Sequence, residues 1–213
     1  LVRGWGLPDR QVLLANGRML LQLLLVGYVL NYIFAADRGL IVVVVLAIML
    51  LMASWIALRP LVQRDLRVYG IVLASILVGG VTTLLLVTQG VLRLAPWYEP
   101  HYMIPLAGMI FSNCMNSISL AAERFESDKT SKDMDSDCRS AMNAALIHQI
   151  NALMAVGIVA LPGMMTGQIL SGVSPLVAAQ YQIVVMCMIF GSAGMSTACY
   201  LVLNRRRLRQ VLS

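Results

Sequence analysis

The amino-acid sequence predicts an all-α integral membrane protein, and composition, segment length and charge placement each support this fold class. Of the 213 residues, 59% are hydrophobic and 12% are charged, whereas a soluble domain usually carries about 25% charged residues. The mean hydropathy is +0.80. The apolar segments reach the roughly 20 residues that a helix needs to cross a bilayer. The net charge of +6 comes from basic residues at the ends of these segments, without interleaved aromatic residues, so no nucleic-acid partner is expected.

About six transmembrane helices are expected, in one membrane domain that covers residues 1–213. The expected spans are 19–34, 40–58, 69–89, 103–122, 141–172 and 176–203. The fifth span is unusual because Pro162, Gly163 and Gly167 interrupt it. In lipid, an interrupted helix is tolerated only where neighbouring protein or a cavity satisfies the freed backbone groups. Ser174 and Pro175 suit the cap and the first turn of the sixth helix.

The basic residues predict the orientation of the chain. If successive connections alternate between the two sides, Arg38 and Arg93 lie on one side and the other 14 of the 16 Lys and Arg residues lie opposite. The positive-inside rule then places both chain ends and the polar segment 123–140, which we expect to be a loop containing both lysines of the chain, in the cytoplasm. The aromatic segment 90–102 faces outward. We therefore expect a multi-pass plasma membrane protein, in a bacterium an inner-membrane protein, whose C-terminus is cytoplasmic and whose basic tail contacts anionic membrane lipid.

The sequence gives no sign of a cofactor bound by this chain. The four cysteines lack paired spacing, so neither a disulfide framework nor a zinc site is indicated, and no metal ligand is assigned. The expected spans contain no Asp, Glu, Lys or Arg, which disfavours a proton or sodium relay. The phosphate-loop pattern Gly-x-x-x-x-Gly-Lys-Ser/Thr is also absent. Any ATP hydrolysis is therefore expected on a partner chain, and this chain is expected not to be an enzyme.

Polar and sulfur-containing side chains gather in two stretches, 105–116 and 148–168, each of which contains a proline followed closely by Gly-Met. We interpret them as two broken helices that line a substrate path. The expected helix-break residues are Pro105, Gly108, Pro162, Gly163 and Gly167. Amide, imidazole, hydroxyl and soft thioether groups would contact the substrate; the candidates are Met109, Asn113, Asn116, His148, Asn151, Met164, Met165 and Thr166.

The same residues also have a structural interpretation. Small residues and amides hold membrane helices together, and methionine commonly fills gaps in apolar cores. A lone intramembrane histidine such as His148 is either a hydrogen-bonded interior residue or a metal ligand. An intramembrane enzyme that uses Ser192 or Cys187 with His148 is a weaker alternative, because no orienting acid is present.

Three runs of sequence carry a resemblance that covers nearly the whole chain. They are Gly17-Arg18 with Gln22-Leu23 and Gly27-Tyr28, then Ile104-Pro105-Leu-Ala-Gly108-Met109, and finally Leu161-Pro-Gly-Met-Met-Thr-Gly-Gln-Ile-Leu-Ser-Gly-Val-Ser-Pro175. In this order they resemble the ABC permease family typified by the bacterial iron exporter FetB and the plant aluminium-tolerance permeases.

The resemblance implies the membrane half of an ABC exporter, with two permease subunits and two cytosolic ATPase subunits that bind ATP and Mg. It implies a cargo of iron or another metal ion that leaves the cytoplasm. The segment 123–140 would contact the ATPase, with Glu123, Arg124, Glu126 and Arg139 as the contact residues. Two alternatives remain: an ABC permease for an organic solute, and a membrane scaffold or assembly subunit that transports nothing.

The chain departs from the family pattern at three points. Members usually carry one more apolar segment before Gly17-Arg18, so this first span is expected to be either lacking or not included in this sequence. The segment 126–137 is shorter than the usual docking segment and lacks its apolar core. Asn151 and Met154 stand where members carry Asp and Lys, which removes charge from the expected path and weakens the case for iron.

Overall fold

The computed structural model describes residues 9–36, 38–61, 65–127 and 134–212. All regular structure within these ranges is helical, which confirms the all-α class. Among the helices, η2 and η3 are π-helical turns within the third long segment. The elements are α1 (Asp9–Ala36), α2 (Gly39–Ala57), α3 (Leu66–Ile76), η2 (Leu77–Val81), α4 (Thr82–Leu85), η3 (Leu86–Val91), α5 (Pro100–Ser127), α6 (Met134–Ala155), α7 (Gly163–Leu170) and α8 (Pro175–Leu212).

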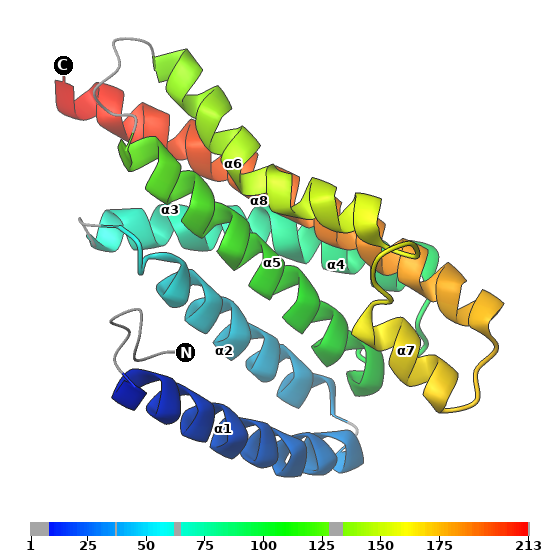
Figure 1. Cartoon of the computed structure of the whole chain (residues 1–213). Helices are drawn as coiled ribbons and strands as arrows, with labels where there is room; N and C mark the ends of the chain where they lie inside the picture. Colours follow the sequence, from blue (N-terminus) through cyan, green and yellow to red (C-terminus); the bar gives the residue numbers. More distant parts are fainter. Residues whose placement is uncertain (1–8, 37, 62–64, 128–133, 213) are drawn as a thin grey trace.

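The helices form a bundle in which α5 lies between α2 on one side and α6 with α8 on the other (Figure 1). The first helix, α1, lies outermost beside α2. The start of α6 and the end of α8 lie at one end of the bundle, which we call the C-terminal end, and α7 lies at the opposite end. This arrangement sets the short helix α7 apart from the charged helix ends.

Five described helical segments are long and apolar enough to cross a membrane: Asn16–Phe34, Gly39–Ala57, Leu66–Val91, Pro100–Ser127 and Pro175–Arg205. They correspond to the expected spans one to four and six. The expected fifth span is not among them; its residues are divided between α6 and α7. The sixth helix begins as expected, with Pro175 in its first position and the Val177 amide donating to Ser174 Oγ at 3.4 Å.

The break in the fifth segment is confirmed, but it is wider than expected. The helix α6 already ends at Ala155, and α7 begins at Gly163 after Pro162 as its N-cap residue. Between them the chain turns at Gly157, whose φ of +80° is a left-handed conformation that glycine adopts readily. Gly167 does not break a helix, since it lies inside α7.

The expected break at Pro105 and Gly108 is wrong, because α5 runs without interruption from Pro100 to Ser127. Pro105 is the sixth residue of this helix. A proline there removes the amide that would bond the carbonyl of residue 101, and the helix tolerates the loss of this single hydrogen bond near its start. The polar residues of the stretch 105–116 therefore all lie on one continuous helix.

The polar segment 123–140, expected as a loop, is largely helical. The helix α5 extends to Ser127 and α6 begins at Met134; residues 128–133, which include the expected loop lysines, lie outside the described residues. The predicted contact residues Glu123, Arg124 and Arg139 are exposed on these two helices, and Glu126 is half-buried.

Polar contacts join the helices at the C-terminal end of the bundle. Arg124 Nε donates to Ser140 Oγ at 2.9 Å and links α5 to α6. Arg205 on α8 pairs with Asp135 on α6, and Arg207 Nη2 lies 3.0 Å from Asp65 Oδ2, just before α3. Four helices thus share one charged, hydrogen-bonded end.

Candidate functional site

A cavity of about 550 Å³ lies at the α7 end of the bundle, between η3, α5, α7 and α8. From α5 it is lined by Tyr102, Pro105, Leu106 and Met109, which share one face because they are spaced three or four residues apart. From α8 it is lined by residues at the same spacing, including Val177, Tyr181 and Val184. The short helix α7 contributes Met164 and Gln168, which are one turn apart.

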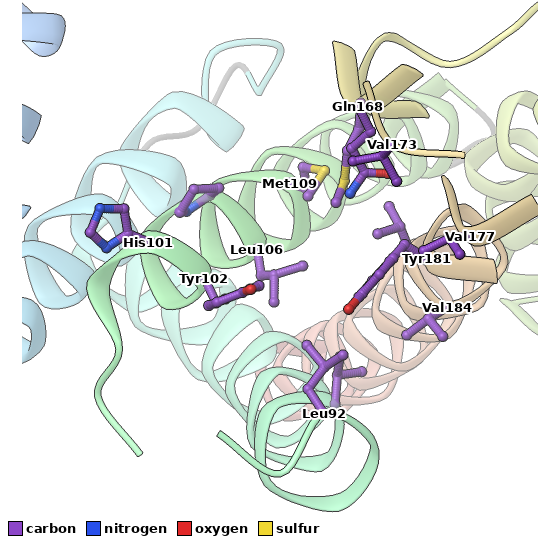
Figure 2. A pocket seen from close by; sticks show the side chains of 14 residues that line it. Leu92, His101, Tyr102, Leu106, Met109, Gln168, Val173, Val177, Tyr181 and Val184 are labelled. Carbon is purple, nitrogen blue, oxygen red and sulfur yellow. The ribbon is translucent and has the colours of Figure 1, made fainter. Parts of the chain in front are cut away.

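Figure 2 shows how the polar groups are placed in this cavity. Tyr102 from α5 and Tyr181 from α8 point their hydroxyl groups into the cavity from opposite walls. Met109 and Gln168 lie together at one end, and Leu92 lies at another. The Gln168 Oε1 atom is buried and has no hydrogen-bond partner among the described residues.

The lining is mostly apolar and carries no Asp, Glu, Lys or Arg side chain. Across the described part of the chain, no group of three or more His, Cys, Asp or Glu side chains could hold a metal ion. His101 is the one titratable imidazole at the edge of the cavity; it stacks on Phe34, with ring centroids 4.1 Å apart, and its Nδ1 lies 3.0 Å from Glu99 Oε1. The cavity therefore offers thioether, amide, phenol and imidazole groups rather than carboxylates.

The predicted path residues are divided by the structure. Met109 and Met164 line the cavity together. Met165 instead lines a second cavity of about 310 Å³, which it shares with Gln182 and Cys187. Thr166 donates its hydroxyl to the Pro162 carbonyl at 3.1 Å and so closes the first turn of α7. Neighbouring residues of α7 thus face different surroundings.

Asn113 lies one helical turn from Met109, outside the cavity lining. Its Nδ2 donates to the Met109 carbonyl at 2.8 Å, and its Oδ1 accepts a hydrogen bond of 2.7 Å from Gln149 Nε2 on α6. The Gln149 side chain is 5% exposed. The pair fixes α6 to α5 beside the cavity and serves as structural support.

The remaining predicted residues lie away from the cavity. Asn116 on α5, and His148 and Asn151 on α6, are exposed on the outside of this chain. The suggested nucleophile Ser192 is fully buried and donates to the Ile189 carbonyl at 3.0 Å. Its hydroxyl is buried whereas His148 is exposed, so this geometry lends no support to the intramembrane-enzyme alternative.

Four residues that matter here were not among the predicted site residues: Tyr102, Gln149, Gln168 and Tyr181. A helical-face argument would have found Tyr102, which precedes Met109 by seven residues on one face of α5. Gln168 lies four residues after Met164 and could have been found in the same way. Gln149 and Tyr181 were distinguishable from their neighbours only by three-dimensional packing.

The chain is similar to several membrane proteins along most of its length. The model of the family described as "Uncharacterised protein family (UPF0014)" matches residues 6–135 and 128–208. The UPF0014 membrane protein slr1647 of Synechocystis is 38% identical over 88% of this chain and 78% of its own length. The probable iron export permease protein FetB of Escherichia coli is 30% identical over 92% of this chain and 82% of its own length.

A plant relative is also similar to the chain. Protein ALUMINUM SENSITIVE 3 of Arabidopsis thaliana is 32% identical over 91% of this chain and 76% of its own length. No solved structure gives a significant match. The matched residues include the runs around Gly17-Arg18, Pro105 and Pro162 that carried the resemblance. The chain therefore belongs to the UPF0014 family, the family of FetB and of the plant aluminium-tolerance relatives.

Proposed function

We propose that this chain is the membrane permease subunit of an ABC exporter, driven by a separate cytosolic ATPase, and that its cargo is iron or another metal ion. The proposal is supported by family membership and by the relative named as a probable iron export permease. The five apolar helical segments give the chain the build of a multi-pass membrane protein. The ATP and Mg would be bound by the partner, and this chain would hydrolyse nothing.

The observation that carries the proposal is the cavity between α5, α7 and α8, at the end of the bundle opposite the charged helix ends. One of its walls is α7, a short helix that follows a seven-residue interruption. Discontinuous helices at membrane depth are typical of transporter binding sites, because unwound backbone is tolerated where it lines a cavity. The orientation predicted from the basic residues would place this cavity on the outer side, where an exporter releases its cargo.

The C-terminal end of the bundle is the proposed ATPase-binding face. Glu123, Arg124 and Arg139 present charged groups there on the ends of α5 and α6. The pairs Arg205–Asp135 and Arg207–Asp65 connect this end to α8 and to the start of α3. Movement imposed on α5 and α6 by ATP-driven closure of the partner would therefore be passed to α8, which also lines the cavity.

A second permease copy is the proposed partner within the membrane. Asn116, His148 and Asn151 are exposed on this chain. They lie near the hydrogen bond between Gln149 and Asn113, and Asn113 is in the middle of the apolar segment Pro100–Ser127. Polar side chains that face hydrocarbon are costly. An isologous contact with a second copy would cover these groups and give the two-permease arrangement of an ABC exporter.

An organic solute is the second candidate cargo. A cavity of about 550 Å³ that is lined mainly by apolar and aromatic side chains, with a few polar groups, has the size and character of a small-molecule site. The cavity therefore also has room for a cargo larger than a bare ion. The two candidates differ in which compounds should stimulate ATP hydrolysis by the complex: metal salts for the first and organic solutes for the second.

The test is to co-express the chain with a candidate ABC ATPase, sought first among the neighbouring genes, and to measure the mass and ATPase activity of the purified, reconstituted complex. We expect a complex of two permeases and two ATPases whose ATP hydrolysis rises several-fold with a metal salt. Stimulation by organic solutes alone would replace the metal by the second candidate. A chain that binds no ATPase, and whose deletion leaves cellular metal content unchanged, would contradict the exporter and favour the scaffold.

A further inference from the structure

We propose that the end of the cavity formed by Met109, Met164 and Gln168 binds a soft, singly charged metal ion of the Cu(I) and Ag(I) class. This inference rests on the proposed function, since it names the class of metal that would occupy the export cavity. The relative's name concerns iron. The side chains of this cavity point to a different kind of ion.

The three side chains converge from two helices. Met164 and Gln168 are one turn apart on α7, so both face the same side of that helix. Met109 comes from α5, and Figure 2 shows it beside Gln168 at one end of the cavity. All three line the same cavity of about 550 Å³, and the rest of its volume is open to other parts of the cargo path.

The Gln168 amide supplies an oxygen ligand beside the two thioethers. Its Oε1 atom is buried and lacks a hydrogen-bond partner within the described residues. A buried, unsatisfied carbonyl oxygen costs about 1–3 kcal/mol. A cation placed between this oxygen and the thioethers would satisfy it.

The donor set selects the ion by softness and by charge. Thioether sulfur binds soft ions such as Cu(I), whereas hard ions require carboxylate or other oxygen ligands. The cavity lining carries no carboxylate to neutralise a multiply charged ion. The cost of placing a charge in an apolar site rises steeply with that charge, so a single positive charge is the most readily accepted.

Methionine also fills gaps in cores, and α7 offers a direct control for that role. Met165 is the neighbour of Met164 on the same helix, but it lines the separate cavity of about 310 Å³. A packing role predicts equal effects of replacing either residue by Leu. A ligand role predicts an effect for Met164 and none for Met165. The exchange of Met for Leu nearly conserves volume, so the fold should tolerate it.

The experiment measures Ag(I) binding by isothermal titration to the full chain in lipid nanodiscs, comparing wild type, the double variant Met109→Leu/Met164→Leu, and Met165→Leu. All three proteins keep the same four cysteines, so differences between them report the thioether site. We expect the double variant to lose one Ag(I) equivalent or to bind it at least tenfold more weakly. Met165→Leu should bind Ag(I) like the wild type.

A parallel titration with Fe(II) and Fe(III) should show no binding that depends on Met109 and Met164. Equal Ag(I) binding by wild type and double variant, an equal loss in Met165→Leu, or iron binding that the double variant abolishes would each overturn the inference. Association with the ATPase is measured separately on the same proteins. A chain that binds Ag(I) as expected but recruits no ATPase would contradict the exporter and leave the metal site intact.

Discussion

Replacing Gly79 by Ala is expected to destabilise the folded chain by about 1–3 kcal/mol, the usual cost of overpacking a well-packed core. A Cβ atom on Gly79 would lie 2.5 Å from the backbone nitrogen of Ser196 and 2.8 Å from its Cα. Both atoms belong to the backbone of α8, so no side chain can rotate away. The two helices would have to separate, and small residues are what allows membrane helices to approach this closely.

Gly70 provides the matched control in the same long segment, because a Cβ atom there would meet no atom within 4 Å. Gly70→Ala should leave the stability unchanged or slightly improve it, since alanine has the higher helix propensity. Thermal unfolding of both variants in detergent measures the difference. Equal midpoints for Gly79→Ala and Gly70→Ala would contradict the close packing of η2 on α8.

The second large effect concerns the amide pair between α5 and α6. Asn113→Leu removes the acceptor for Gln149 Nε2 and leaves an almost fully buried amide unsatisfied. We expect a loss of about 1–3 kcal/mol, the usual cost of a buried polar group without a partner. The denaturation midpoint of the purified variant, compared with wild type, measures this loss.

The double variant Asn113→Leu/Gln149→Leu separates this cost from a general loss of packing. Replacing both partners by apolar groups removes the unsatisfied amide, so the double variant should be more stable than Asn113→Leu alone. If the two substitutions were simply additive, the pair would have no coupling and its assigned role would be wrong.

The fold class and most helices followed from properties that are local in sequence. Runs of apolar residues define the spans, and Ser174-Pro175 marks the start of α8, because capping and proline geometry act over one helical turn. Pro162-Gly163 correctly indicated a break, whereas Pro105-Leu-Ala-Gly108 did not. The difference is positional, since a proline near a helix start is compatible with the helix and one after a long apolar run is not.

The candidate site could be predicted only in part. The sulfur and amide groups near residues 109 and 164 were found by composition, but the sequence does not say which face of α7 turns inward. Met164 and Met165 are adjacent and chemically identical, yet they line different cavities. Likewise, Gln149 is buried and paired while His148 beside it is exposed, a difference set by how α6 packs on α5.

The central claim, that cargo leaves through the cavity between α5, α7 and α8, is tested most directly by ATP-dependent uptake into inside-out vesicles. The vesicles would carry the chain with its ATPase, and uptake of Ag(I) and of iron would be followed. We predict ATP-dependent metal uptake by the wild type and a loss of at least tenfold in Val184→Trp, which places a large side chain in the cavity. Uptake that does not require ATP, or that is unchanged in Val184→Trp, would contradict the account.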